Sequence, residues 1–297
     1  MTHRRLVGPA PQTVAGVIRS ASIPPSGPNT LDGTQSFQQR KDLSMATRDT
    51  HSIGAPCRVD TFQPDPRGAM DFYGPLFGWS FDDPMPMPAG LEGDYFAARL
   101  RGRLVAGIGQ APALSRPTWN THVRVDDVAQ ALARAEQAGG TRLAGPFCVG
   151  PEGGLAVVAD ATGVPFCLWQ AGETDEAVLA DEPNSWAMSS LHTTDVGRAQ
   201  AFYGALFDWE LEPVPNAAFS LWRRSGRVVA VVTATDGVAV PPHWSVNFAV
   251  RDPDSIAQHA VALGGTILMA PMNTPGFRNA VIGDPQGGVI AVSAPAS

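Results

Sequence analysis

The clearest pattern along the chain is a pair of segments with apolar side chains at helical spacing. Residues 65–77 carry one apolar stripe at positions i, i+3, i+4 and i+7, made of Ala69, Phe72, Tyr73 and Leu76. Residues 128–138 carry a second stripe, made of Val128, Ala131, Leu132 and Ala135. Asp65 and Asp127 stand where a side chain can cap the free N–H groups of a helix. We therefore predict two amphipathic helices, the second ended by Gly139-Gly140.

Short runs of strand-forming residues surround both helices. One run precedes each helix, over Arg58–Phe62 and Thr121–Val125. Further runs follow the helices at Tyr95–Leu100, Leu104–Gly109, Leu155–Ala159 and Pro165–Trp169. The order of one strand, one helix and three strands, a βαβββ module, is therefore predicted twice in succession.

The whole arrangement then recurs. The line Phe72-Tyr73-Gly74-x-Leu76-Phe77-x-Trp79 returns 130 residues later as Phe202-Tyr203-Gly204-x-Leu206-Phe207-x-Trp209. Downstream matches follow at an offset of about 125 residues, with Trp119 and Asp127 returning as Trp244 and Asp252. Because so many aromatic positions coincide, we interpret the chain as a duplication.

The duplication predicts an α+β fold of four βαβββ modules in two domains. We place the first repeat at residues 53–172 and the second repeat at residues 184–297. Residues 173–183 hold five acidic side chains and are predicted to be an acidic linker. Residues 1–52 are rich in Pro, Ser, Thr, Gln and Gly, and we expect a flexible N-terminal tail there.

Composition excludes several classes of partner. The net charge is −7 without a basic cluster, which disfavours nucleic acid, and no apolar run approaches the length of a membrane span. The pair Arg4-Arg5 lacks the apolar stretch of a signal peptide. Three cysteines without a CxxC pair do not form a disulfide framework, so we expect a cytoplasmic location.

The modules and the Phe-Tyr-x-x-Leu-Phe-x-Trp line resemble the vicinal oxygen chelate superfamily, which includes glyoxalase I, bleomycin-resistance proteins and extradiol dioxygenases. The chain is most similar to tandem two-domain glyoxalase-like proteins of actinobacteria, some of which belong to antibiotic-biosynthesis gene clusters. The resemblance implies two glyoxalase-like curved sheets. In the metal-using members, the concave face holds a divalent ion through His, Gln or Glu.

The positions implied for those metal ligands hold other residue types. In the first repeat they are Arg58, Asn120 and Cys167, and in the second repeat they are Met188, Ser245 and Ala291. The sequence does not place the fourth ligand of each site, which lies near Gly107 in the first repeat and near Val228–Val232 in the second. We therefore predict no metal and no cofactor.

Strand alternation indicates which side chains line the concave faces, or cups, instead. If Asn120 faces the first cup, His122 and Arg124 face it too. The predicted ligand-binding residues of the first repeat are Arg58, Asp60, Phe62, Asn120, His122 and Trp169. Those of the second repeat are Met188, Ser190 and Asn247, with His192, Ala291 and Ser293 on the same face. Trp169 and Trp222 lack repeat partners, which makes them candidates for stacking a planar ligand.

Several of these residues allow two interpretations. His122 is either a proton acceptor or a histidine satisfied by backbone groups or by Asp60. Arg58 with Asp60 either binds a carboxylate or phenolate or forms a neutralised pair. Cys167 is expected to be a buried, unreactive thiol because it lies between Phe166 and Leu168.

Three functions stay open. The first is a metal-independent protein that binds an apolar or aromatic small molecule, in antibiotic biosynthesis or resistance. The second is a glyoxalase-type lyase or isomerase, or a hydroxylase-like enzyme, with His122, Asp60 and Arg58 as the catalytic candidates. The third is an accessory protein of a biosynthetic monooxygenase. We expect a monomer or a homodimer.

Overall fold

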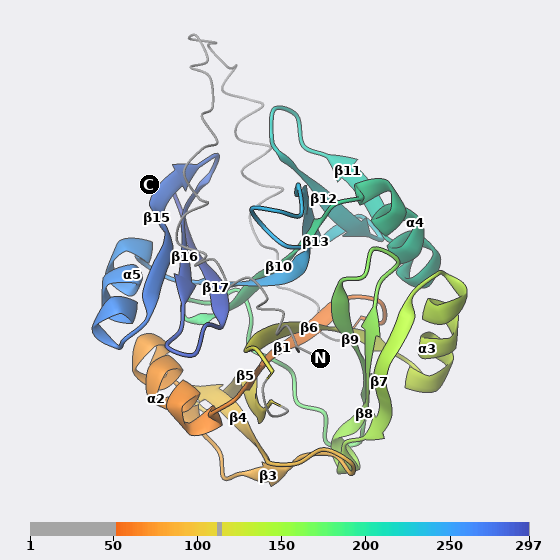
Figure 1. Ribbon diagram of the computed structural model, residues 1–297, viewed down its shortest axis with the longest axis horizontal. Helices are drawn as coiled ribbons and strands as arrows, with labels where there is room; N and C mark the ends of the chain where they lie inside the picture. The colour runs from red at the N-terminus through yellow and green to blue at the C-terminus, as the bar shows by residue number, and fades with distance from the viewer. Residues whose placement is uncertain (1–51, 112–114, 297) are drawn as a thin grey trace, which may run out of the picture.

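The computed structural model describes residues 52–111 and 115–296. The predicted flexible tail lies outside the described residues, apart from Ser52. The described residues form two mixed sheets with helices on one side of each (Figure 1). The prediction of an α+β fold made of four βαβββ modules is confirmed.

The first sheet belongs to the first repeat and has the strand order β2-β4-β5-β1-β6-β9-β8-β7, with β3 paired to β4. Its strands are β1 (Pro56–Gln63), β2 (Ser80–Phe81), β3 (Met85–Pro86), β4 (Asp94–Leu100), β5 (Arg103–Gln110), β6 (Thr118–Val125), β7 (Thr141–Cys148), β8 (Gly153–Ala159) and β9 (Pro165–Ala171). The first strands of the two modules, β1 and β6, pair antiparallel at the centre. Each also pairs in parallel with the last strand of its own module.

The second sheet repeats this order as β11-β12-β13-β10-β14-β17-β16-β15. Its strands are β10 (Ser185–Thr193), β11 (Glu210–Pro213), β12 (Phe219–Arg224), β13 (Arg227–Ala234), β14 (His243–Ala249), β15 (Thr266–Thr274), β16 (Phe277–Gly283) and β17 (Val289–Pro295). The central antiparallel pair is β10 with β14. The duplication seen in the sequence is thus a duplication of sheet topology.

Each module has one α-helix, and aspartate begins all four. The helices are α2 (Pro66–Phe77), α3 (Val128–Gln137), α4 (Val196–Phe207) and α5 (Pro253–Ala262), and a 3₁₀ turn, η2, covers Gly150–Glu152. The side chains of Asp65 and Asp127 accept backbone N–H groups of the first turn, as predicted. Asp195 and Asp252 do the same in the second repeat. The predicted apolar stripes of α2 and α3 are buried.

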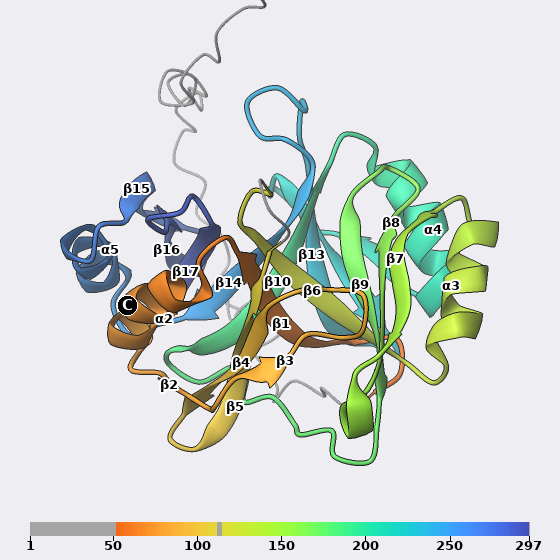
Figure 2. The same ribbon diagram turned by 60° about the horizontal axis from the view of Figure 1, so that its bottom comes forward.

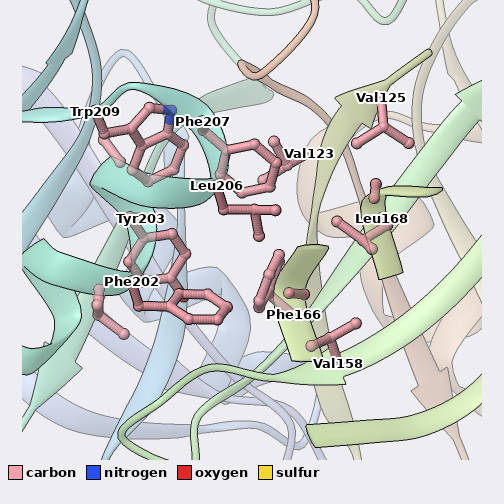
Figure 3. Packing of buried hydrophobic residues seen from close by; sticks show 14 of the residues in the cluster. Val123, Val125, Val158, Phe166, Leu168, Phe202, Tyr203, Leu206, Phe207 and Trp209 are labelled. Carbon is pink, nitrogen blue, oxygen red and sulfur yellow. The ribbon is translucent and has the colours of Figure 1, made fainter. Parts of the chain in front are cut away.

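The helices pack across the boundary between the repeats. Figure 1 shows α2 beside α5 and α3 beside α4, and both pairs are in contact. In one of the two large cores, Phe202 and Tyr203 of α4 lie against Phe166 of the first sheet, and Phe207 lies beside Val123 (Figure 3). Because the cores use the helix side of each sheet, the opposite faces remain as the two cups.

The recurring tyrosine of the Phe-Tyr-Gly line locks one repeat to the other. Tyr73 donates its hydroxyl hydrogen to Asp284 at 2.7 Å, and Tyr203 donates to Asp160 at 2.9 Å. Both aspartates are buried and belong to the Asp-x-x-Gly turn of the opposite repeat. The following tryptophan also bonds to the opposite repeat, since Trp79 Nε1 donates to the Asn184 carbonyl in the second repeat. The repeated residues therefore form two equivalent contacts between the repeats, Tyr73 with Asp284 and Tyr203 with Asp160, which we call the clasps.

The acidic linker lies along the first sheet. Glu176 pairs with Arg99 at 2.9 Å, Glu182 contacts Arg101, and the backbone N–H of Leu179 donates to the Leu104 carbonyl at 2.7 Å. Its charges thus meet arginines of the β4–β5 hairpin. No helix in the described part of the chain is long and apolar enough to cross a membrane.

Candidate functional site

A cavity of about 430 Å³ lies on the cup face of the first sheet. Its floor is formed by residues predicted from strand alternation, which are Arg58, Asp60 and Phe62 of β1, His122 of β6 and Trp169 of β9. Figure 2 shows these three strands side by side in the middle of the first sheet. The central antiparallel pair therefore brings polar side chains from both modules into one place.

The cavity walls come from two segments that close over the sheet. Residues 85–89 form one wall with the sequence Met-Pro-Met-Pro-Ala, next to Tyr95 of β4. Residues 148–151 around η2 form the other wall, with Leu155 of β8 below them. Thioether and proline side chains make these walls mainly apolar, and methionine sulfur packs well against aromatic rings.

Trp169 is fixed in place on two sides. The guanidinium carbon of Arg58 lies 4.2 Å from the centre of the indole ring, which is cation–π distance. On the edge, Trp169 Nε1 donates to Asp175 Oδ1 at 3.0 Å, and the other oxygen of Asp175 accepts from Arg124 at 2.7 Å. Asp175 belongs to the acidic linker, so the linker positions a cavity residue.

Asp60 is a buried carboxylate with three polar neighbours. Asn120 donates to Oδ1 at 2.9 Å, His122 Nε2 lies 2.9 Å from Oδ2, and the Tyr95 hydroxyl lies 3.4 Å from Oδ2. Burial alone raises the pKa of Asp60, but His122, Asn120 and Arg58 outweigh it and lower the pKa below its ordinary value. Asp60 is therefore ionised at neutral pH. Asn120 supports Asp60 rather than lining the cavity.

His122 lines the cavity floor, but its side chain is almost fully packed against its neighbours. Its side chain is 2% exposed, and its contact with Asp60 is short but not aligned with a ring N–H. Both ring nitrogens are shielded from solvent and make no aligned hydrogen bond with the described residues. The ring edge faces Trp169 at 6.3 Å between centroids. Of the two interpretations from the sequence, a histidine held by Asp60 fits this geometry better.

Two glycines of β5 make room for the aromatic lining. A β-carbon on Gly107 would lie 1.8 Å from the Tyr95 hydroxyl, and one on Gly109 would lie 2.7 Å from the Phe62 ring. Gly107 also pairs with Asp60 in the sheet register. The strand position that the sequence left unplaced is thus a glycine covered by Tyr95.

The residues of the first cup do not fit a divalent metal ion. The four central strands bring Gly107, Asp60, His122 and Cys167 into neighbouring positions. Gly107 has no donor, the Asp60 carboxylate is already held, and burial raises the pKa of Cys167 well above its ordinary value, so this thiol stays protonated. Among the described residues, no three His, Cys, Asp or Glu side chains are grouped to hold a metal ion.

The second cup offers even fewer ligands. Ser190 pairs with Val231, and Asn247 pairs with Ala291, so these positions supply one hydroxyl and one amide. Asn247 donates to the Ser293 hydroxyl at 3.0 Å. Met188, Ser190 and Asn247 are half-buried on this face and do not line the 430 Å³ cavity. The structure thus separates them from the candidates of the first repeat.

Trp222 does not occupy the place predicted for it. It is 0% exposed and lies in the core between Tyr203, at 6.0 Å between centroids, and Trp209, at 5.9 Å. Its β12 position points toward α4 and not into a cup. The prediction that Trp222 stacks a ligand is therefore corrected, because the lack of a repeat partner says nothing about which face a side chain takes.

The cysteines in the described residues are free thiols. Cys57 and Cys167 are buried, and burial raises the pKa of Cys57 to about 12. Cys167 is therefore the unreactive buried thiol that the sequence predicted.

The second repeat contains a stacked histidine pair that gives a pH prediction. The ring centroids of His192 and His243 lie 4.6 Å apart. Burial of His192, and to a smaller degree the charge of His243, lowers the pKa of His192 to about 4. Protonation then favours the unfolded chain, so stability should fall as the pH drops from about 6.5 to about 4. We expect a loss of about 2 kcal/mol over this window.

Urea unfolding at pH 7 and at pH 4.5 measures this effect. The variant His192→Gln should show a smaller difference between the two pH values, and the remainder is expected from His243, whose pKa burial also lowers. His259→Gln, on the exposed side of α5, is the matched control and should behave like the parent. An unchanged pH dependence in His192→Gln would contradict the assignment.

Sequence reasoning missed the cavity walls. From Trp79 to Arg99 the first repeat spans 20 positions, whereas the equivalent stretch from Trp209 to Arg223 spans 14. The two arginines are equivalent because each donates to a carbonyl three residues further on, that of Gly102 or Gly226. The extra residues are the Met-Pro wall. The change of repeat offset from 130 to 125 was the signal of this insertion.

Comparisons with known proteins agree with the geometry. A family model described as a glyoxalase-like domain matches residues 58–169 and 188–293. The protein named "Putative glyoxylase CFP32" of Mycobacterium bovis is 34% identical over 260 residues, covering 85% of this chain and 99% of its own length. Anthracycline biosynthesis protein DnrV of Streptomyces peucetius is 32% identical over 264 residues, covering 80% of this chain and 92% of its own length.

Solved structures support the fold. The Mn(II)-bound glyoxalase from Novosphingobium aromaticivorans superposes with a TM-score of 0.57 at 16% identity, covering 81% of this chain and 82% of that chain. A variant of homoprotocatechuate 2,3-dioxygenase from B. fuscum gives a TM-score of 0.56 at 17% identity, covering 83% of this chain and 72% of that chain. At such low identities the likeness concerns the fold alone.

Proposed function

We propose, for a chain that belongs to the glyoxalase-like family, that the first cup binds a planar aromatic small molecule with protein side chains alone. The resemblance to the vicinal oxygen chelate superfamily is confirmed by the family match and the structural neighbours. The observation that carries the proposal is the cavity of about 430 Å³ with Trp169 in its floor. Its setting would be antibiotic biosynthesis or resistance, since one relative is an anthracycline biosynthesis protein.

The cavity has the properties of a small-molecule site. Such sites usually measure about 300–1,000 Å³, and their walls are mainly apolar with few polar groups. Here the apolar walls are the Met-Pro segment and Leu155, and the indole of Trp169 is held rigidly by Asp175. A fixed aromatic ring loses little entropy on binding, so it favours a flat ligand.

An enzyme of the glyoxalase or hydroxylase-like kind is the second candidate function. The close contact of Asp60 with His122 in the cavity floor favours it. It is less well supported, because the His122 nitrogens are shielded and a general base must reach the proton that it removes. The role as an accessory protein of a monooxygenase and the monomeric or dimeric state stay predictions.

A tryptophan fluorescence titration tests the proposed function. The protein is dialysed against a chelator and titrated with planar polyketides, including an anthracycline aglycone, and with a saturated-ring compound as the control ligand. We expect saturable quenching by the planar compounds only, unchanged by chelation. Unchanged tryptophan fluorescence with every compound, or quenching only after a divalent metal is restored, would contradict the proposal.

A further inference from the structure

The first cup contains a guanidinium that lacks a hydrogen-bonded partner within the described part of the chain. Arg58 lines the cavity, and its guanidinium carbon lies 4.2 Å from the centre of the Trp169 ring. No oxygen of the described residues accepts a hydrogen bond from it. A guanidinium has five N–H donors, and leaving them unsatisfied at a partly buried position is costly.

The nearby carboxylates are already engaged by other groups. Asp60 is held by Asn120 and by His122, each at 2.9 Å. Asp175 is held by Arg124 at 2.7 Å and by Trp169 at 3.0 Å. Both influence Arg58 through their charges, yet each has nearer partners. Arg58 is thus a cation that lines the cavity and has no hydrogen-bonded partner among the described residues.

The stacking on Trp169 orients the guanidinium. A guanidinium that lies over an indole keeps its N–H groups near its own plane, directed outward. A carboxylate or phenolate at the edge of this plane can accept two parallel hydrogen bonds. The aromatic part of such a ligand would extend along the cavity toward the methionine wall at residues 85–89.

We propose that the first cup selects planar aromatic ligands that carry an acidic oxygen group, a carboxylate or an ionised phenol, and that Arg58 binds this group. This inference rests on the proposed function and adds the ligand class. It assigns to Arg58 the role of the specificity-determining residue. Asp60 also lines the cavity, but its oxygens are engaged by Asn120 and His122.

The test compares two ligands of nearly the same shape, the charged anthraquinone-2-carboxylate and the neutral anthraquinone-2-carboxamide, by isothermal titration calorimetry at pH 7. The wild-type chain should bind the carboxylate about 10- to 100-fold more tightly, which is the effect of a charge-assisted bidentate hydrogen bond. In Arg58→Met the carboxylate affinity should fall to that of the carboxamide, and Arg58→Lys should keep part of the preference. Arg223→Met, at a half-buried ion-paired arginine of the second sheet, is the matched control and should keep the full preference.

Each outcome decides between the two proposals. Equal affinities in the wild-type chain would overturn the acidic-ligand inference while leaving the proposed function intact, and this comparison needs no variant. A preference that survives in Arg58→Met would show that another group binds the acid. If neither compound binds, both proposals fail.

Discussion

Replacing Asp284 with alanine is expected to lower the free energy of unfolding by about 3–5 kcal/mol. Asp284 is 4% exposed and accepts four hydrogen bonds. The donors are the Tyr73 hydroxyl at 2.7 Å, the Gln63 amide at 2.8 Å, and the backbone N–H groups of Gln286 at 2.9 Å and Gly288 at 2.8 Å. Without the carboxylate, the Tyr73 hydroxyl and the Gly288 N–H remain buried without an acceptor.

Urea denaturation followed by circular dichroism measures this loss. Asp236→Ala is the matched control, because Asp236 also accepts backbone N–H groups of Val238 and Ala239 but lies in an exposed turn. We expect the control to lose only a small part of this free energy, because water replaces the lost contacts of an exposed side chain. A loss of that small size in Asp284→Ala would refute the view that this clasp holds the repeats together.

The second clasp gives an internal comparison. Asp160→Ala should be destabilised to a similar degree, because Tyr203 and the turn around Thr162 and Val164 depend on it in the same way. A double-mutant cycle between Tyr73→Phe and Asp284→Ala isolates the contact that crosses between repeats.

Replacing Trp169 with leucine is expected to weaken binding of a planar ligand by about 30-fold, or about 2 kcal/mol. Leucine keeps the site apolar but removes the flat ring and the surface on which Arg58 stacks. Fluorescence is unsuitable once the reporter is removed, so calorimetry with the anthraquinone pair is the measurement.

Trp222→Leu is the control for this variant. Trp222 is as deeply buried as Trp169 but lies in the core beside Tyr203 and Trp209. The control should lose stability without losing affinity. If Trp222→Leu weakened binding and Trp169→Leu did not, the ligand site would have to lie elsewhere.

Local patterns predicted the fold and the cavity floor well. The period of two along β1 placed Arg58, Asp60 and Phe62 on one face, since neighbouring strand residues must point to opposite sides. The same rule placed His122 and Trp169. These predictions needed only the backbone geometry of a strand.

Long-range pairing was beyond such patterns. Tyr73 and Asp284 are both visible as repeated residues, yet they are 211 positions apart. A duplicated sequence does not say whether the tyrosine pairs within its own repeat or with the other. The prediction for Trp222 was wrong for a related reason. Its burial beneath α4 is decided by packing between elements, which a local pattern does not show.

A crystal structure of the chain with anthraquinone-2-carboxylate tests the central claim most directly. The account predicts ligand density in the first cup, with the ring system against Trp169 and the Met-Pro wall and the carboxylate at the Arg58 guanidinium. Density in the second cup near Met188 and Asn247, or a ligand held by a metal ion, would contradict it.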